Sequence, residues 1–393
     1  MENLFNYNWE LCKVGDFGRE IYGGGTPKTS VKEFWSGTLP WIQSSDLKED
    51  KVCDIKAKKH ISVKAIQQSS AKKISKNSIA IVTRVSVGKL VLMPYEYATS
   101  QDFLSISVLQ VDKWFGVYSL YNKLQSELNS VQGTSIKGIT KDELLNKKIM
   151  IPKPLKEQSK IGLFLKKIDT TIALHQRKLD QLKELKKAYL QVMFPAKDET
   201  VPRMRFAYFE GEWELCKLGD FLIVPPKIKA TIDNPSDLMT VKLNLGGVYS
   251  GASRDTLSLG STIYYKRFSG QFIYGKQNFF NGSMAIIPKE LHGKATSGDV
   301  PSFDIININK DYLFYFISRK SYWKSKEVEA TGTGSKRIHE KTLQNFSILV
   351  PLKDEQIRIS TFCEKIDDTI TLHQNKLNQL KSLKKSYLQN MFI

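Results

Sequence analysis

A regular spacing of apolar positions runs through two segments of the chain. From Ile161 the spacing alternates between four and three residues as far as Met193, and the same spacing runs from Ile359 to Met391. An average period of 3.5 residues, sustained over this length, is typical of the contact stripe of a coiled coil. The pattern predicts two long helices, the first of which ends at Pro195. The predicted stripe residues are Ile161, Leu165, Ile168, Ile172, His175, Leu179, Leu182, Tyr189 and Met193, then Ile359, Ile366, Ile370, His373, Leu377, Leu380, Tyr387 and Met391, with Lys186, Cys363 and Lys384 completing the spacing.

The two predicted helices are near copies of each other. Residues 174–194 read LHQRKLDQLKELKKAYLQVMF, residues 372–392 read LHQNKLNQLKSLKKSYLQNMF, and 16 of these 21 positions are identical. All five differences lie outside the stripe. Matching stripes favour pairing of the helices with each other; the alternative is that each stripe packs on its own domain. His175 and His373 occupy equivalent stripe positions, where we favour a role in fixing the register of the pair over a role in binding a metal.

Shorter landmarks are duplicated as well. WELCKVGDF at 9–17 returns as WELCKLGDF at 213–221, and GTSIKGI at 133–139 is echoed by GTGSKRI at 332–338. The segments between these landmarks barely resemble each other, so each half repeats a frame around different contents. We divide the chain into a first domain, a first helix, a linker with a second domain, and a second helix, at residues 1–152, 153–195, 196–351 and 352–393.

Both variable segments predict α+β structure. Runs rich in β-branched residues at 78–84 and 103–111 predict strands in the first segment, and runs at 261–268, 282–288 and 303–309 predict strands in the second. We therefore expect two globular α+β domains separated by a pair of long helices. A pseudo-twofold internal repeat would make those helices an antiparallel coiled coil. The 33 residues from Ile161 to Met193 span roughly 50 Å as a helix, which suits a spacer.

The charge of the chain points to a polyanion. Lys and Arg outnumber Asp and Glu by 59 to 40, and the net charge of +19 suggests nucleic acid or an anionic membrane surface as partner. No run approaches the ~18 apolar residues of a membrane-spanning helix, and no signal peptide is recognisable, so the membrane reading is disfavoured. The four cysteines have neither disulfide nor CxxC spacing, and we expect them to be reduced in a cytoplasmic protein.

The loops combine positive charge with amide and hydroxyl groups. Arg and Lys neutralise phosphates, Arg can read guanine, and Gln and Asn can read adenine. The alternative for any single Lys is a solvated surface. The candidate DNA-binding residues are Thr26, Lys28, Thr83, Arg84, Ser86, Lys89, Ser100, Gln101 and Lys137 in the first half, and Arg254, Lys276, Gln277, Asn278, Lys336 and Arg337 in the second.

The sequence carries no recognisable catalytic motif. YGGGTP does not match a dinucleotide-binding pattern, and there is no Walker A or HExxH motif. The Asp/Asn-Pro-Pro-aromatic tetrad of nucleic-acid methylases is missing, as are the clustered carboxylates of a nuclease. These observations favour a chain that recognises DNA without acting on it, with no catalytic residue and no metal site.

The sequence resembles the specificity subunits of type I restriction–modification systems over nearly its whole length. The resemblance is carried by WELCKVGDF…GGGTP…GTLPWIQSSDL, by IPKPLKEQ and VPLKDEQ at the starts of the helices, and by the twin helices themselves. The junction MFPAKDETVPRMRFAYFEGEWELCKLGDF is also similar to that of the family.

The resemblance implies two target-recognition domains, each of which reads one half of a bipartite duplex DNA site. It implies two modification subunits that bind near the helices, carry S-adenosylmethionine and methylate adenine. It also implies restriction subunits, with motor and nuclease activity, that use ATP and Mg²⁺; this chain itself would hold no cofactor. Two other hypotheses remain open: a coiled-coil scaffold that joins two protein-binding domains, and a solitary nicking or modifying enzyme.

Overall fold

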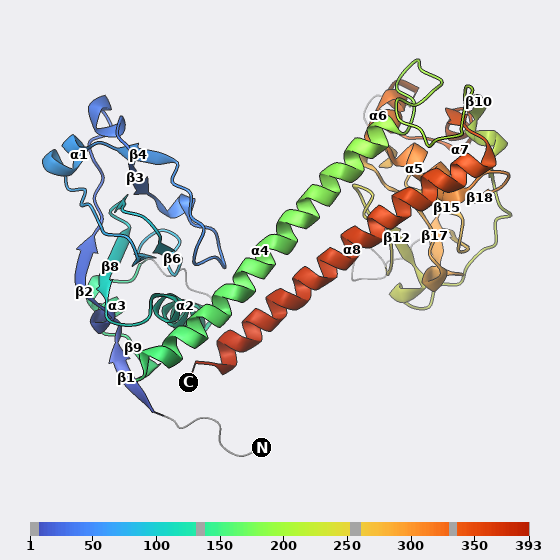
Figure 1. The fold of residues 1–393 in the computed structure, drawn as a ribbon. Helices are drawn as coiled ribbons and strands as arrows, with labels where there is room; N and C mark the ends of the chain where they lie inside the picture. Colours follow the sequence, from blue (N-terminus) through green and yellow to red (C-terminus); the bar gives the residue numbers. More distant parts are fainter. Residues whose placement is uncertain (1–7, 131–137, 252–260, 330–335, 393) are drawn as a thin grey trace. The chain divides into compact units, whose positions relative to one another are not determined.

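The computed structural model describes residues 8–130, 138–251, 261–329 and 336–392, which fold into two compact units (Figure 1). The first unit comprises residues 1–178 and 373–393, and the second comprises residues 179–372. The boundary falls inside both long helices, α4 (Leu155–Val192) and α8 (Lys353–Asn390), so each unit contains one part of each helix. The content of helices and strands confirms the predicted α+β class.

The first unit is built on a four-stranded antiparallel sheet in the order β2-β8-β5-β6. In β5, Ile79 and Ile81 belong to one hydrophobic cluster, while Ala80 and Val82 belong to another. Both faces of the strand are therefore buried, which explains its continuous apolar sequence. A three-stranded sheet, β4-β3-β7, and a two-stranded ribbon, β1-β9, complete the unit. The bounds are β1 Trp9–Lys13, β2 Gly18–Gly23, β3 Leu39–Ile42, β4 Lys59–Ile61, α1 Val63–Gln68, β5 Ser78–Val82, β6 Leu90–Met93, β7 Ala98–Thr99, β8 Phe103–Leu109, α2 Lys113–Ser130, α3 Lys141–Leu145 and β9 Lys148–Pro152.

The second unit repeats this plan. Its four-stranded antiparallel sheet has the order β11-β18-β15-β16, and its two-stranded ribbon is β10-β19. Two further ribbons, β12-β13 and β14-β17, complete the unit, and the parallel bridge between Leu238 and Ala295 matches the parallel pairing of Trp41 with Ala98 in the first unit. The bounds are β10 Glu214–Lys217, β11 Leu222–Ile223, β12 Met239–Val241, β13 Val248–Ser250, β14 Tyr264–Lys266, β15 Phe272–Tyr274, β16 Met284–Ile286, β17 Ala295–Ser297, β18 Ser302–Ile305, α5 Lys310–Ser318, α6 Lys320–Ser325, α7 Glu340–Gln344 and β19 Ser347–Val350.

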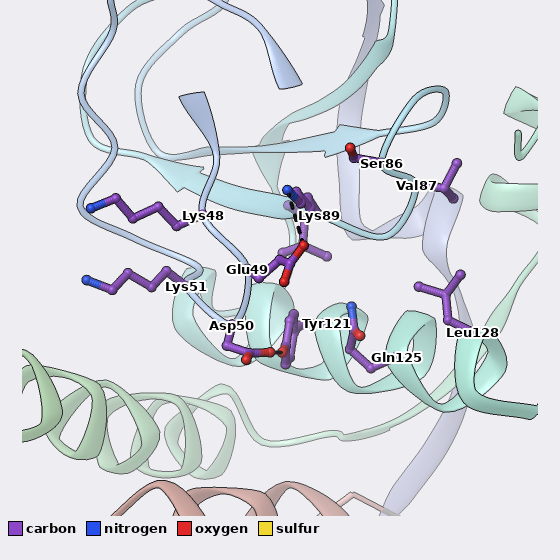
Figure 2. Close-up of a pocket in the computed structure, with 11 residues that line it drawn as sticks. Lys48, Glu49, Asp50, Lys51, Ser86, Val87, Lys89, Tyr121, Gln125 and Leu128 are labelled. Atoms are coloured by element: carbon purple, nitrogen blue, oxygen red, sulfur yellow. Dashed lines mark hydrogen bonds and ion pairs between the residues drawn. The ribbon is translucent and has the colours of Figure 1, made fainter. Parts of the chain in front are cut away.

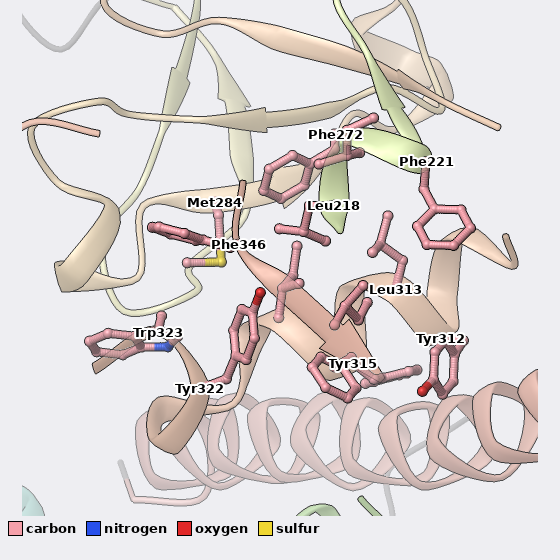
Figure 3. Packing of buried hydrophobic residues seen from close by; sticks show 14 of the residues in the cluster. Leu218, Phe221, Phe272, Met284, Tyr312, Leu313, Tyr315, Tyr322, Trp323 and Phe346 are labelled. Carbon is pink, nitrogen blue, oxygen red and sulfur yellow. The ribbon is translucent and has the colours of Figure 1, made fainter. Parts of the chain in front are cut away.

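The core of the second unit is rich in aromatic side chains. Phe272 of β15, Tyr312 of α5 and Phe346 are fully buried in one cluster, shown in Figure 3. Ile273 of β15 points into a separate cluster on the other face of the sheet. The alternation along β15 therefore matches that along β5, and both strands are central to their sheets.

A buried glutamine fastens the start of each long helix to the globular part. Gln158 accepts a hydrogen bond from the Asp112 amide (2.9 Å) and donates one to the Pro152 carbonyl (2.8 Å). Its repeat equivalent, Gln356, makes the same two bonds, with the Asn309 amide and the Pro351 carbonyl, each at 2.9 Å. Both glutamines lie in the duplicated Lys/Asp-Glu-Gln segments, so the frame is repeated down to single hydrogen bonds.

Within each unit the two long helices run antiparallel. In the first unit, Phe164 packs edge-on against Tyr387 with ring centroids 4.9 Å apart, and His175 lies next to His373. In the second unit, the equivalent pair Tyr189 and Phe362 has the same centroid separation, 4.9 Å. Equivalent residues thus meet each other in both units.

The predicted stripe residues are all buried or half-buried, and they divide between two kinds of packing. Ile161 and Leu165 contact the core of the first unit, while Met193, Ile359 and Cys363 contact the core of the second. The ends of the stripe therefore pack on the globular parts and its middle lies where the helices pair. Both alternatives considered from the sequence occur, each on its own portion of the stripe.

Candidate nucleic-acid interface

A hairpin loop follows the central strand of each unit, at residues 83–89 after β5 and 275–283 after β15, and the two loops are held in the same way. In the first unit, the Thr83 amide donates to the Asp102 carbonyl (2.8 Å), and the Ile139 amide donates to the Thr83 carbonyl (2.8 Å). Thr83 directly follows β5. Both sides of its peptide backbone are therefore fixed by segments distant in the sequence.

The second unit has the same arrangement around Lys276. The Lys276 amide donates to the Asp299 carbonyl (2.9 Å), and the Ile338 amide donates to the Lys276 carbonyl (3.0 Å). Lys276 stands two residues after the end of β15. Because the partners correspond one to one, Thr83 and Lys276 are structurally equivalent, and so are Asp102 and Asp299.

The two hairpin loops also close alike. The Val82 amide donates to the Lys89 carbonyl (2.8 Å), and the Gly275 amide donates to the Ser283 carbonyl (2.9 Å). The residue before each closing position is a glycine with positive φ, +90° for Gly88 and +69° at position 282. That conformation suits glycine because it has no Cβ. The second loop is one residue longer, so its exposed side chains follow a different path.

The first hairpin loop forms one wall of a hollow of about 680 Å³. Arg84 and Gln101 are exposed on this wall, whereas Thr83 is 9 % exposed and donates its hydroxyl hydrogen to the Asp102 carbonyl (3.0 Å). The end of β2 forms another side of the hollow. There a Cβ on Gly24 would lie 1.8 Å from the Ser100 carbonyl oxygen, so a close backbone approach explains the second glycine of the GGG motif.

The same loop contains an unfavourable backbone conformation. Val85 has a φ of +31° and Ser86 a φ of +70°, in the region that β-branched and other L-residues avoid. Each such residue costs roughly 1–3 kcal/mol. Val85 is also 69 % exposed, so core packing does not compensate for the strain. Uncompensated strain of this kind is typical of loops that are shaped for a ligand.

The other side of the hairpin loop faces a second hollow, of about 260 Å³, shown in Figure 2. Ser86 and Lys89 lie here, together with Lys48 and Lys51. The Lys89 ammonium is 3.7 Å from a carboxylate oxygen of Glu49, so its charge is partly balanced. The candidates on this loop are therefore divided between its two sides: Arg84 faces the larger hollow, and Ser86 and Lys89 face the smaller one.

Several predicted cations of the second unit have acidic partners. Lys276 is 13 % exposed and lies 3.1 Å from Glu340. The Arg337 guanidinium lies 3.3 Å from the Asp299 carboxylate, and the Lys336 ammonium lies 3.1 Å from the carboxylate of Glu327. The charge of these side chains is thus partly balanced within the protein. Gln277 and Asn278 are exposed on the hairpin loop, as expected for residues that reach a ligand.

The remaining candidates are spread more widely. Lys28 is exposed and Thr26 is half-buried. Ser100 is 5 % exposed and donates its hydroxyl hydrogen to Asp102 (3.3 Å), so its side chain shapes the hollow rather than facing out of it. Lys137 and Arg254 lie outside the described residues.

Asp102 and Asp299 were missed from the sequence, although their carbonyls position both hairpin loops. A signal was present: ATSQD at 98–102 recurs as ATSGD at 295–299. Lys48 and Lys51, which line the smaller hollow, were also missed. They carried no signal beyond being lysines in a basic chain.

The described residues offer no group of three or more His, Cys, Asp or Glu that could hold a metal ion. His175 and His373 place their Nδ1 atoms 3.1 Å apart, which is a hydrogen-bond distance between two rings. One ring must donate and the other accept, so the pair joins equivalent points of the two helices. In the part of the chain that the structure describes, no helix is long and apolar enough to cross a membrane.

Comparison with known proteins gives a consistent family. The family model described as "Type I restriction modification DNA specificity domain" matches twice, at residues 6–184 and 210–382. The type I restriction enzyme MjaIX specificity subunit of Methanocaldococcus jannaschii is 24 % identical, over 98 % of this chain and 92 % of that protein. The MjaVIII specificity subunit of the same organism is 21 % identical, over 97 % and 91 %.

Solved structures show the same fold. The S subunit of a type I restriction–modification system from M. genitalium superposes with a TM-score of 0.64 at 13 % identity, covering 100 % of this chain and 98 % of that one. A chain from a structure of type I R-M complex assembly and conformational transition gives a TM-score of 0.54 at 14 % identity, covering 99 % and 98 %. At these identities the likeness concerns the fold alone.

Proposed function

Because the chain belongs to the type I restriction–modification DNA specificity family, we propose that each of its two units reads one half of a bipartite duplex DNA site. The chain selects the sequence and performs no chemistry on it. The two half-sites differ, because the exposed side chains of the two hairpin loops differ.

The matched hairpin loops support this proposal most directly. Two equivalent backbone positions, Thr83 and Lys276, are fixed by the same pair of hydrogen bonds, and unlike side chains follow them. A constant scaffold that carries variable loops is the usual design for recognition. The net charge of +19 provides the non-specific attraction to phosphates that sequence-reading proteins need.

We assign the base contacts to four exposed members of the candidate set. Arg84, Gln101, Gln277 and Asn278 stand on the hairpin loops or beside them and are exposed. Thr83 and Ser100 support the loop from within, and the paired Lys276, Lys336 and Arg337 contribute charge near it. We assign phosphate contacts to Lys89 and Ser86, which face the smaller hollow.

The paired helices set the spacing between the half-sites and dock two modification subunits. Those subunits supply S-adenosylmethionine, and restriction subunits supply the ATP- and Mg²⁺-dependent reaction; this chain holds neither cofactor. We expect the complex to work in the reducing cytoplasm, where the four free cysteines stay reduced.

The spacing role is tested by changing the length of the helices. Insertion of one heptad into both helices lengthens each by roughly 10 Å, which is about three base pairs of duplex. We expect the methylated site to keep both half-sites and to gain about three base pairs between them. Mapping of methylated adenines in DNA exposed to the complex measures this, and an unchanged spacing would refute the role.

DNA recognition itself is tested with the purified complex of this chain and its modification subunits. We expect sequence-dependent methylation, and duplex binding that weakens steeply as salt rises, because phosphate contacts release counterions. Methylation without sequence preference would refute the proposed function. Absence of duplex binding, with protein partners bound regardless of moderate salt, would instead favour the protein-scaffold hypothesis.

A further inference from the structure

The structure identifies one matched pair of exposed side chains in the two units. Arg84 follows Thr83 and Gln277 follows Lys276, the two positions that share the same backbone hydrogen bonds. Arg84 and Gln277 therefore leave equivalent points of the two scaffolds. The sequence alone did not align them, because the segments around them do not resemble each other.

The side chain just before each of these residues is bound to another residue of the protein. Thr83 is 9 % exposed and its hydroxyl hydrogen is bound to the Asp102 carbonyl. Lys276 is 13 % exposed and bound to Glu340. These two side chains are held back from solvent, so the first side chain of each loop that is free to reach a ligand is the next one.

Arg84 and Gln277 are both exposed, and neither has a side-chain hydrogen bond or ion pair with any residue that the structure describes. Arg84 lies on the wall of the larger hollow, beside Gln101. The strained residues Val85 and Ser86 follow it directly and turn the chain. The strain of Val85 and Ser86 holds this loop in one shape, and the Arg84 guanidinium on it is left available to a ligand.

The chemistry of the two side chains differs in a way that bases can distinguish. The guanidinium fork of arginine fits the O6 and N7 acceptors of guanine, and the carboxamide of glutamine fits the N6 donor and N7 acceptor of adenine. We propose, on the basis of the proposed function, that Arg84 reads a guanine in one half-site and Gln277 reads an adenine at the corresponding place in the other. The two residues are specificity determinants at one equivalent position of the internal repeat.

The experiment uses the full chain in complex with its modification subunits and a duplex library in which the two half-sites are randomised. The readout is the sequence around each methylated adenine, together with the methylation rate on the wild-type site. Arg84→Gln should remove the preference for guanine at one position of one half-site and lower the rate on the original site by roughly 5- to 100-fold. The other half-site should stay unchanged.

Gln277→Arg is the reciprocal variant. It should replace adenine by guanine at one position of the second half-site and leave the first unchanged. Arg84→Lys keeps the charge and loses the fork, so it should lower discrimination at the guanine position, whereas a residue that only contacts phosphate would tolerate it. Lys72→Gln is the matched control: Lys72 is exposed in the first unit and lines neither hollow, so losing its charge should leave the recognised sequence unchanged.

An unchanged recognition sequence in both Arg84→Gln and Gln277→Arg, with or without a uniformly lower rate, overturns the inference and leaves the proposed function standing. Methylation by the wild-type complex that ignores sequence overturns the proposed function instead. Thermal melting checks that each variant is folded, which we expect because both side chains are exposed.

Discussion

The two units make the same contacts where their globular parts meet the long helices, and different contacts at their hairpin loops. In the first unit, Tyr118 of α2 donates its hydroxyl hydrogen to Asp169 of α4 (2.6 Å). Lys384 of α8 binds the other oxygen of the same carboxylate (2.6 Å). One acidic residue thus joins the globular part to both helices.

In the second unit, Tyr315 of α5 donates to Asp367 of α8 (2.8 Å), and Lys186 of α4 binds the other carboxylate oxygen (2.5 Å). These residues are the equivalents of the first triad, with the roles of α4 and α8 exchanged. Each globular part is therefore attached to the long helices by the same contacts, although the hairpin loops of the two units differ. The loops are therefore free to differ between the units.

The frame departs from its repeat at one carboxylate. In the first unit, Trp9 donates its indole hydrogen to Glu157 (3.2 Å), and this glutamate is half-buried. In the second unit, Arg205 of the linker binds the equivalent Glu355 through two bonds of 2.7 Å. The indole nitrogen of Trp213 is then buried without a partner among the described residues. The linker replaces a hydrogen bond from a neutral donor by an ion pair.

Breaking the ion pair between Arg205 and Glu355 should produce the largest difference in stability between the two units. Arg205→Ala leaves the Glu355 side chain, which is 1 % exposed, without its cation, and should lower the free energy of unfolding of the second unit by about 3 kcal/mol. Urea unfolding followed by hydrogen exchange in each unit measures the effect. Arg203→Ala is the matched control, because Arg203 pairs with a glutamate at the surface of the same linker and should matter little. Equal losses in the two variants would contradict the assignment.

The frame could be predicted from the sequence, because its signals are local and periodic. The spacing from Ile161 to Met193 follows α4, which begins earlier, at Leu155, and ends at Val192, one residue before the last predicted position. The predicted strand at 78–84 contains β5. The helical period and the internal repeat can both be recognised in a single sequence, because each is a pattern within a continuous segment of the chain. The family resemblance depends on the same repeated segments.

The interface could be predicted only in part. Lys276 seemed free because Glu340 stands 64 positions later in the chain and nothing local links them. Arg205 and Glu355, separated by 150 positions, gave no signal either. Long-range pairing decides which cations are neutralised, and residue type alone does not reveal it. The equivalence of Arg84 and Gln277 likewise depends on backbone hydrogen bonds and not on sequence similarity.

The triads should differ in strength although they match in geometry. The Lys384 and Asp169 side chains are 9 % and 12 % exposed, whereas Lys186 and Asp367 are 28 % and 36 % exposed. Water screens the second pair more, so Asp169→Asn should cost about 2 kcal/mol of unfolding free energy and Asp367→Asn about 1 kcal/mol or less. The same urea experiment, read separately in each unit, compares them.

The carboxamide of asparagine keeps the shape, removes the charge and replaces one acceptor oxygen by an NH2 donor. These changes are the same in both variants, so the difference between the two losses reports the difference in exposure. Thr170→Val is a suitable control, since Thr170 is exposed next to the first triad and bonds only to its own helix backbone. A larger loss in Asp367→Asn than in Asp169→Asn would show that exposure does not set the strength of these triads.

The smallest difference between the units is expected for their cysteines. Cys12 of β1 and Cys216 of β10 occupy equivalent strands, both are half-buried, and burial followed by nearby carboxylates raises the pKa of each thiol. Because only the thiolate reacts with iodoacetamide, both thiols should be alkylated slowly at pH 8, at rates within about threefold of each other. Below the pKa, each rate should rise about tenfold for each unit of pH increase. Burial raises the pKa of Cys363 to about 12, so this thiol should stay unmodified while Cys12 and Cys216 react. Peptide mass spectrometry over a time course measures all three, and a Cys12 rate far from that of Cys216 would mean that the repeated strands are not equally protected.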